Sequence, residues 1–356
     1  MNNLYIGVMS GTSLDGIDLA LCEIGTQNCK LLHFKEFAFP KEIKEEILYI
    51  ISGSTTLKQI GTLDTKLGTL FANTIKQFLD ELKIDKKDIT AIGLHGQTLW
   101  HEPNAEFPFS MQLGSASVVL AQTGIQTITD FRNLDIAHGG EGAPFAPAFH
   151  QFLYKDEKEE TALVNIGGMA NITLLGEKLL GWDSGCGNVL LDYWMHTTQH
   201  KPYDKDGAFA QSGKLSHQLL EQMLQDDYFK KPAPKSTGRE YFNPTWLEKH
   251  LLSFTDLDNA SVQRTLLELT AISIANDLKT TAITQLIVCG GGAKNLFLMQ
   301  RLENLSQVKV IKAENSDALE AMAFAWFAYK RNKNEVVELR SVTGASDNAS
   351  LGAIYG

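Results

Sequence analysis

The chain has 356 residues, enough for one or two domains that each hold a hydrophobic core. Its hydrophobic fraction of 44% and charged fraction of 21% are those of a globular protein in water. The formal net charge of −10 argues against a nucleic-acid groove, which needs clustered lysines and arginines, but it is compatible with a small anionic ligand.

The sequence shows no targeting, membrane or metal-binding motif. It begins almost at once with an apolar strand and lacks the regions of a signal peptide, and no run of about 18 apolar residues is present. The four cysteines form no CxxC pair, and the nine histidines include no HExxH. We therefore expect a protein of the reducing cytoplasm that binds neither a membrane nor nucleic acid.

The first motif is a turn rich in small residues between two apolar strands within residues 4–21. The turn consists of Gly11, Thr12, Ser13, Leu14, Asp15, Gly16, Ile17 and Asp18. Its glycines free the backbone, and its hydroxyls and amides can form an anion-binding concavity. Such a turn suits a phosphate, although from this stretch alone an ordinary glycine-rich hairpin remains the alternative.

The next segments predict a third strand, a long helix and a buried strand. Residues 30–39 continue the sheet until Pro40, and apolar side chains at three- and four-residue steps predict a helix over 56–82. A strand over 89–94 then places His95 at its C-terminal edge, where ligands of α/β sheets bind. His95 is either a ligand contact or a satisfied core histidine.

A second strand exit carries the arginine that we expect to bind an anion. A short helix around 114–122 precedes a strand that leads to Arg132, whose guanidinium can hold a carboxylate or phosphate with two bonds. The glycine-rich loop 135–147 contains His138 and Glu141, and ordering such a loop without a ligand is costly, which favours a functional role.

The middle of the chain repeats the opening plan. Residues 161–175 read as strand, glycine-rich turn and strand, and 179–188 place Asp183 at the end of a further short strand. Two such units about half a chain apart predict a duplicated fold with a cleft between its halves. Asp183 could alternatively be a turn residue that caps its own loop.

The remaining residues predict a helical region, a buried strand and a final helix. Residues 189–278 read as mainly helical, interrupted by the polar loop 231–240, in which Lys235 and Arg239 read as solvated charges. After a strand over 285–289, the run 290–292 would let a ligand approach the backbone closely before a helix begins at Leu296.

The last helix is expected to run to about Asn332. Ser316 is expected to cap it, with Asp317 and Glu320 in its first turn, where a carboxylate compensates the helix dipole.

These segments resemble the superfamily of acetate kinases, sugar kinases, heat-shock proteins and actin. More closely, the chain resembles the anhydro-N-acetylmuramic acid kinase family from Ile6 to Tyr355, and the matching motifs lie at residues 11–18, 95–98, 130–135, 139–144, 165–168 and 235–240. One departure is that Asp183-Ser184-Gly185-Cys186-Gly187-Asn188 stands where the family pattern has Asp-Thr-Gly-Pro-Gly-Asn. The acid, both glycines and Asn188 are kept, and Cys186 reads as buried packing.

The resemblance implies an α/β fold with two duplicated ribonuclease-H-like lobes, the actin-like ATPase fold, around a central nucleotide cleft. Lobe I would span 1–130, with 341–356 returning to it, and lobe II would span 131–340. The resemblance also implies a homodimer.

The activity implied is that of an ATP- and Mg²⁺-dependent kinase of peptidoglycan recycling. Water would open 1,6-anhydro-N-acetylmuramic acid while the 6-oxygen takes the γ-phosphoryl group, giving N-acetylmuramic acid 6-phosphate and ADP. Asp183 would be the general base, and Asp15 or Asp18 would hold the metal through water. The residues implied to bind ATP are 11–18, Asn165, Gly167, Gly168, Gly290, Gly291, Gly292 and Asn295; those implied to bind the sugar are Ser13, His95, Arg132 and Glu320.

Two alternative functions share these motifs. One is a kinase of the same fold that acts on another sugar or acid, which only the loops 132–144 and 235–240 would distinguish. The other is a nucleotide-switched binding protein like the chaperones and filament proteins of the fold, which is disfavoured because we expect no peptide-binding β domain after the two lobes.

Overall fold

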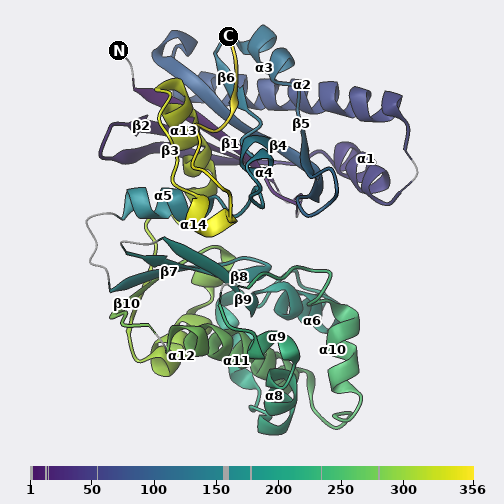
Figure 1. Ribbon diagram of the computed structural model, residues 1–356. Coiled ribbons are helices and arrows are strands. Elements are labelled where there is room, and N and C mark those ends of the chain that lie inside the picture. Colours follow the sequence, from purple (N-terminus) through teal and green to yellow (C-terminus); the bar gives the residue numbers. More distant parts are fainter. Residues whose placement is uncertain are drawn as a thin grey trace. The chain divides into compact units, whose positions relative to one another are not determined.

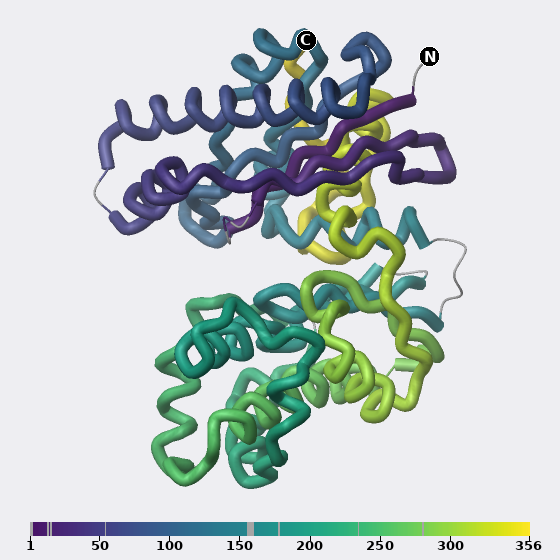
Figure 2. The backbone as a smooth tube through the Cα atoms, turned by 180° about the vertical axis from the view of Figure 1, so that it is seen from behind, coloured from purple at the N-terminus to yellow at the C-terminus, as the bar shows by residue number. Residues whose placement is uncertain are grey.

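The computed structural model describes residues 3–12, 14, 16–53, 55–154, 160–176, 179–233, 235–279 and 281–356 (Figures 1 and 2). The chain divides into two compact units. Unit 1 comprises Met1–Leu153 with Ala318–Gly356, and unit 2 comprises Tyr154–Asp317. Each unit contains its own β-sheet, which agrees with the predicted mixed α/β fold of two lobes.

The boundaries of the units differ from the lobe limits expected at 130/131 and 340/341. Residues 131–153 and 318–340 belong to unit 1, whereas lobe II was expected to cover 131–340. The reason is the helix α13, Leu319–Asn332, which packs against the first strands of the chain, while α5, Ala146–Leu153, packs against α13.

The sheet of unit 1 has seven strands among the described residues, in the order β12-β6-β4-β1-β2-β3, with β5 paired to β4. The three strands expected at the start of the chain, β1–β3, form an antiparallel meander, and β4 runs parallel to β1. β12 pairs antiparallel with β6, so the C-terminal residues return to this sheet. The strands are β1 Leu4–Ser10, β2 Gly16–Ile24, β3 Cys29–Ala38, β4 Ile89–Glu102, β5 Phe109–Leu113, β6 Thr127–Thr129 and β12 Ala353–Tyr355.

Helices cover both faces of this sheet (Figures 1 and 2). Side chains alternate along β1, so Ile6 and Val8 join a hydrophobic cluster with α2 while Gly7 faces α13. The predicted helix over 56–82 is α2, which Thr56 and Gln59 begin with a capping box. The helices are α1 Lys41–Ile51, α2 Leu57–Leu82, η1 Lys86–Asp88, α3 Ala116–Thr123, α4 Asn133–Ala137, α5, α13 and α14 Arg340–Thr343.

Two glycines at matching positions of β1 and β4 let α13 lie directly on the sheet. Gly7 and Gly93 are partners in the parallel register. A Cβ on Gly7 would overlap with the carbonyl oxygen of Ala321, and one on Gly93 would overlap with that of Phe324. Because both oxygens belong to the helix backbone, neither can move aside as a flexible side chain would.

We therefore expect Gly93→Ala to destabilise unit 1 by about 1–3 kcal/mol or more, since α13 must shift away from the sheet. Hydrogen exchange of the α13 amides and urea unfolding measure the effect. The matched control is Gly61→Ala in α2, where a Cβ would meet nothing within 4 Å. There the same substitution should stabilise by about 0.5–1 kcal/mol. Equal effects at the two positions would contradict the close packing.

Unit 2 contains a five-stranded sheet in the order β11-β10-β7-β8-β9 among its described residues. β7 and β8 form the predicted strand-turn-strand, and β10 is the predicted buried strand, parallel to β7. The strands are β7 Thr161–Ile166, β8 Met169–Leu175, β9 Leu180–Cys186, β10 Gln285–Cys289 and β11 Lys309–Lys312.

The helices of unit 2 build one hydrophobic cluster with one face of this sheet, to which Val164 and Ile172 contribute. The predicted helical character of 189–278 is confirmed. The helices are α6 Val189–Gln199, η2 Lys205–Gly207, α7 Ala208–Ser212, α8 His217–Leu224, α9 Asp227–Lys230, α10 Pro244–Leu251, α11 Asn259–Leu278, η3 Gly291–Lys294 and α12 Leu296–Ser306.

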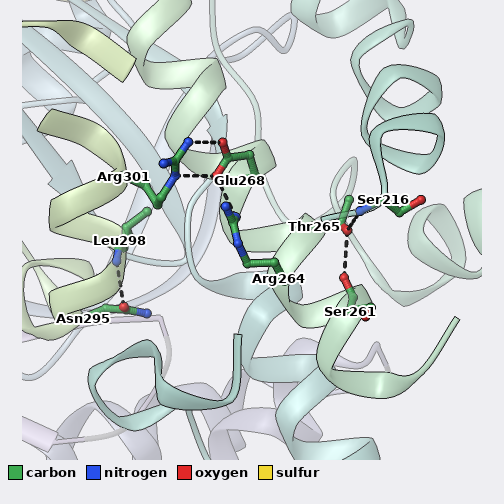
Figure 3. Close-up of polar contacts among 8 residues, drawn as sticks. All are labelled: Ser216, Ser261, Arg264, Thr265, Glu268, Asn295, Leu298 and Arg301. Atoms are coloured by element: carbon green, nitrogen blue, oxygen red, sulfur yellow. Dashed lines mark hydrogen bonds and ion pairs between the residues drawn. The ribbon is translucent and has the colours of Figure 1, made fainter. Parts of the chain in front are cut away.

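A buried ion triad joins α11 to α12 (Figure 3). Glu268 is 4% exposed and accepts hydrogen bonds from Arg264 Nη1 at 2.7 Å and from Arg301 Nε and Nη2 at 2.9 and 2.6 Å. Although burial opposes it, these hydrogen bonds lower the pKa of Glu268. The carboxylate is therefore charged at neutral pH and neutralises two arginines inside unit 2.

The expected cap of the last helix is wrong. The N-cap of α13 is Ala318, without a side-chain hydrogen bond, and the buried Ser316 Oγ has no partner among the described residues. Asp317 forms an exposed ion pair with Lys294 at 2.9 Å. The Asp317 carboxylate therefore has a specific partner, the Lys294 ammonium, in addition to the dipole of the helix.

Candidate functional site

The turn after β1 is tied to the neighbouring strand β4. Ser10 Oγ donates to Gln97 Oε1 at 2.5 Å, and Gln97 Nε2 donates to the Gly11 carbonyl at 3.3 Å. The Leu14 amide closes the turn onto the same carbonyl at 3.2 Å, with φ of 56° at Leu14. Gly11 thus begins a turn whose position is set by Gln97.

The described part of this turn can offer a ligand its backbone and the polar side chains of Thr12 and Asp18. The side chains of Leu14 and Ile17 are buried in the hydrophobic cluster of unit 1, while Thr12 is exposed. Ser13 and Asp15, which were implied to bind ATP, sugar or metal, lie outside the described residues.

Asp18 lies in β2, directly opposite Glu36 of β3. The Glu36 side chain also lies against Gly16, where a Cβ would be 2.8 Å from its Oε1. Like charges opposite each other on a sheet repel, so a cation near these two carboxylates would be favourable. No group of three or more His, Cys, Asp or Glu side chains within the described ranges is arranged to hold a metal.

His95 was expected at the end of a strand, and this is wrong. β4 continues to Glu102 because its second half pairs with β5. Parallel pairing of β4 with β1, however, ends at Ser10 and Gln97. The buried His95 therefore still lies beside the C-terminal end of β1.

Arg132 and His95 contact each other, as the sequence could not foresee. Arg132 Nη2 donates to His95 Nε2 at 3.0 Å, and Nη1 donates to the Gly142 carbonyl at 2.9 Å. Burial lowers the pKa of Arg132 to about 10, a shift that the Glu320 carboxylate partly opposes. Burial, with the Arg132 charge, lowers the pKa of His95 to about 3. A charged guanidinium and a neutral imidazole therefore coexist at neutral pH.

Protonation of His95 and of His150, whose pKa burial also lowers to about 3, should destabilise unit 1 in acid. The unfolded chain protonates histidine near pH 6.5, so stability falls as the pH falls from about 6.5 towards 3. NMR titration of the imidazole carbons would measure both values. An imidazole that titrates near 6.5 would contradict the burial described here.

The glycine-rich loop after Arg132 is ordered by the protein itself. Asp135 Oδ2 accepts from the Gly142 amide at 2.8 Å, and Asp135 Oδ1 accepts from Thr343 Oγ1 at 2.8 Å. The Glu141 amide donates to the Thr343 carbonyl at 2.9 Å. Contacts within the protein therefore account for the order of this loop, and the expected dependence on a ligand is not needed to explain it.

In unit 2, a row of polar side chains crosses the sheet at one level. Asn165 of β7 pairs with Asn171 of β8, and Asn171 pairs with Asp183 of β9. Their neighbours Val164 and Ile172 point into the hydrophobic cluster, so the row lies on the opposite face. Asp183 was expected at the end of its strand, but β9 continues to Cys186 because it stays paired with β8.

The loop 231–240 contacts Asp183 at the open edge of β9. The Asp183 amide donates to the Lys235 carbonyl at 2.8 Å. Asp183 Oδ2 accepts from the Thr237 amide at 3.0 Å and from Ser236 Oγ at 3.2 Å. The interpretation of Lys235 as a solvated charge is wrong, because its side chain is 3% exposed and pairs with Asp277 at 3.2 Å.

Arg239, from the same loop, is exposed as expected. Its guanidinium nevertheless lies over the turn between β7 and β8, since a Cβ on Gly168 would be 3.5 Å from Arg239 Nη2. The carbonyls of Gly167 and Gly168 accept hydrogen bonds from the amides of residues 187–189 at the start of α6. Hydrogen bonds from residues 187–189 thus hold this turn in place, and the Arg239 guanidinium lies beside it.

The run of glycines after β10 borders a cavity of about 410 Å³. Gly290 has φ of 76°, and a Cβ there would collide with Asn165 Oδ1, so only glycine fits. Gly291, Asn295 and Asn188 line the cavity, whose size is that of a small-molecule site. Asn295 Oδ1 also accepts from the Leu298 amide at 3.0 Å and caps α12 (Figure 3).

Cys186 is buried, and burial raises the pKa of its thiol to about 12. The thiol is therefore protonated at neutral pH and unreactive, as expected of packing. All four cysteines are free. No helix within the described part of the chain is both long and apolar enough to cross a membrane.

A solved structure has a similar fold. Component A of (R)-2-hydroxyglutaryl-CoA dehydratase from Acidaminococcus fermentans matches with a TM-score of 0.51 at 11% identity, covering 93% of this chain and 99% of that one. This likeness concerns the fold alone.

Sequence relatives identify the family. The family model for anhydro-N-acetylmuramic acid kinase matches residues 3–356. Proteins named anhydro-N-acetylmuramic acid kinase from Sulfurovum sp. and Sulfurimonas denitrificans are 53% and 50% identical, covering 99% and 100% of this chain and 98% and 100% of theirs. The chain belongs to the anhydro-N-acetylmuramic acid kinase family.

Proposed function

We propose that this protein is an ATP-dependent kinase that hydrolytically opens 1,6-anhydro-N-acetylmuramic acid and phosphorylates its 6-oxygen, in the recycling of cell-wall peptidoglycan. The observation that carries the proposal is the Asp183 carboxylate, held at a fixed place on the sheet in a chain that matches the family over residues 3–356. The products are N-acetylmuramic acid 6-phosphate and ADP.

Asp183 is the general base in this proposal. Its carboxylate takes a proton from water, whose oxygen bonds to the anomeric carbon as the bond from that carbon to the 6-oxygen breaks. The freed 6-oxygen attacks the γ-phosphorus, and ADP leaves. The two donors on Asp183 Oδ2 support this role because they hold the carboxylate in one orientation.

ATP is proposed to bind through both glycine-rich turns and the cavity beside Gly291. The turn 11–18 and the turn at Gly167 and Gly168 would meet the phosphates, for which backbone amides and the nearby Arg239 cation are suitable partners. The cavity of about 410 Å³ has room for part of a nucleoside. Within unit 2, Asn165 lies against Gly290, and Gly290 directly precedes Gly291 at the cavity.

The sugar is proposed to contact His95, Arg132 and Glu320, with Ser13 outside the described residues. A guanidinium suits the lactyl carboxylate of the sugar, and the neutral His95 can share a hydrogen bond with a hydroxyl. Glu320 lies in the first turn of α13, where burial raises the pKa of its carboxyl and the Arg132 charge opposes that shift. Its carboxyl is proposed to accept from sugar hydroxyls.

Magnesium fits the acidic pair of Asp18 and Glu36 by its chemistry, because it prefers carboxylate oxygens and several waters. Asp18 is proposed to hold it through water, and Asp15 is the alternative. When bound, the ion would neutralise phosphate charge.

We also propose that the protein is a cytoplasmic homodimer. Light scattering of the purified protein would measure the number of subunits.

The first experiment is ADP release by the purified protein with ATP and Mg²⁺, with and without 1,6-anhydro-N-acetylmuramic acid. N-acetylmuramic acid and N-acetylglucosamine serve as matched acceptors that lack the anhydro bridge. We expect turnover with the anhydro sugar only, and a product phosphorylated at the 6-oxygen. Equal turnover with a reducing sugar would indicate a conventional sugar kinase. Turnover without sugar would contradict the proposal and favour a nucleotide-switched binding protein.

A further inference from the structure

Lys235 is a buried cation in a polar surface loop. Its side chain is 3% exposed, and its Nζ lies 3.2 Å from Asp277 Oδ1 and 5.1 Å from the centre of the Tyr228 ring. Removing an ammonium from water is costly unless a partner compensates it. The ion pair with Asp277 of α11 therefore fixes where this part of the loop must lie.

The same pair is attached to β9 at Trp182 and at Asp183. Asp277 Oδ2 accepts from Trp182 Nε1 at 3.0 Å, one residue before Asp183. The Lys235 carbonyl accepts from the Asp183 amide at 2.8 Å. Tyr228 adds a third attachment, since its hydroxyl donates to the Asp183 carbonyl at 2.7 Å.

The two residues after Lys235 are the donors to the Asp183 carboxylate. With Lys235 in place, the Ser236 hydroxyl and the Thr237 amide lie 3.2 and 3.0 Å from Asp183 Oδ2. Donors of this kind favour the charged form of a carboxylate and restrict its rotation. Both donors thus lie within two residues of the buried ammonium.

We propose that Lys235 is a positioning residue for the Asp183 base: through its ion pair with Asp277, it holds residues 235–237 against β9 so that two donors orient the carboxylate. The inference rests on the proposed role of Asp183. Lys235 acts through the loop that it anchors.

The test is the Lys235→Met variant, which keeps the aliphatic stem and removes the charge. We expect kcat to fall about tenfold to a hundredfold, as for a reactive group displaced by about 1 Å, with KM for ATP little changed. Because the donors favour the charged base, the acid limb of the kcat–pH profile should also move to higher pH. A merely structural lysine would not move that limb.

The matched control is Lys231→Met. Lys231 Nζ lies 5.6 Å from the centre of the same Tyr228 ring, but the residue is exposed. This variant should keep the kcat and the acid limb of the wild type. If the ion pair acts as a unit, Asp277→Asn should reproduce the loss, and the Lys235→Met/Asp277→Asn double variant should lose about as much kcat as Lys235→Met alone.

The outcomes separate this inference from the proposed function. If Lys235→Met behaves like Lys231→Met while Asp183→Asn is inactive, the inference is overturned and the proposed base stands. If Asp183→Asn keeps full activity, the role of Asp183 fails, and the inference fails with it. Should Lys235→Met not unfold cooperatively, Ser236→Ala decides the matter: it removes one donor from an exposed position, and an unchanged acid limb would overturn the inference.

Discussion

Replacement of Asp183 by asparagine is expected to lower kcat by about a hundredfold to ten-thousandfold, the usual contribution of a positioned general base. Asparagine has nearly the same shape, and its carbonyl oxygen can keep the hydrogen bonds from Ser236 and Thr237. The amide, however, cannot take a proton from water. ADP release with saturating ATP and anhydro sugar measures the loss.

Nucleotide affinity and thermal stability serve as the controls for this variant. Both should stay near the wild-type values, because Asp183 is not among the residues that line the cavity beside Gly291. A variant that keeps more than a tenth of the wild-type kcat would show that another group activates the water.

Glu268→Ala is expected to destabilise unit 2 by about 3–5 kcal/mol, since it leaves two guanidinium groups without their buried carboxylate. Hydrogen exchange of the α11 and α12 amides in the full chain measures the loss, with α2 of unit 1 as an internal reference. The wild type has a lowered pKa at Glu268. The contribution of Glu268 is therefore complete above the unfolded pKa of about 4.3 and falls as the carboxylate is protonated below it.

The control replaces all three charges at once. Arg264→Met/Glu268→Leu/Arg301→Met removes the buried charges without leaving one unpaired, so it should recover most of the lost stability. If the triple variant is as unstable as Glu268→Ala, packing around these side chains is more important than their charge.

Most helices and strands could be predicted from local sequence patterns, because residues close together in the sequence determine them. The meander of β1–β3, the helix α2 and the strand β10 follow from apolar periodicity and from turn residues next to each other in sequence. The C-terminal strand β12 was expected in the first lobe from the family resemblance. The lobe boundaries could not be predicted, since α13 belongs to unit 1 through contacts with strands some three hundred residues earlier.

The residue types of the candidate site could be predicted from the sequence, but the surroundings of each residue could not. Lys235 looked solvated because its partner Asp277 is 42 residues away, and only the folded chain brings them together. The loop at Gly142 looked dependent on a ligand because Thr343, which helps to order it through Asp135, is 208 residues away from Asp135. Asn171 was not chosen, although its position six residues after Asn165 in a two-strand hairpin could have indicated a cross-strand pair.

The discontinuity of unit 1 has a consequence for how the protein is made. A ribosome synthesises all of unit 2 before it begins α13, the helix that packs over Gly7 and Gly93 on the sheet of unit 1. At about 5–20 residues per second, the first strands therefore wait many seconds for the helix that covers them. During that interval the nascent chain exposes an uncovered sheet face, which is the kind of surface that chaperones bind. Unit 1, whose synthesis begins first, is thus completed last.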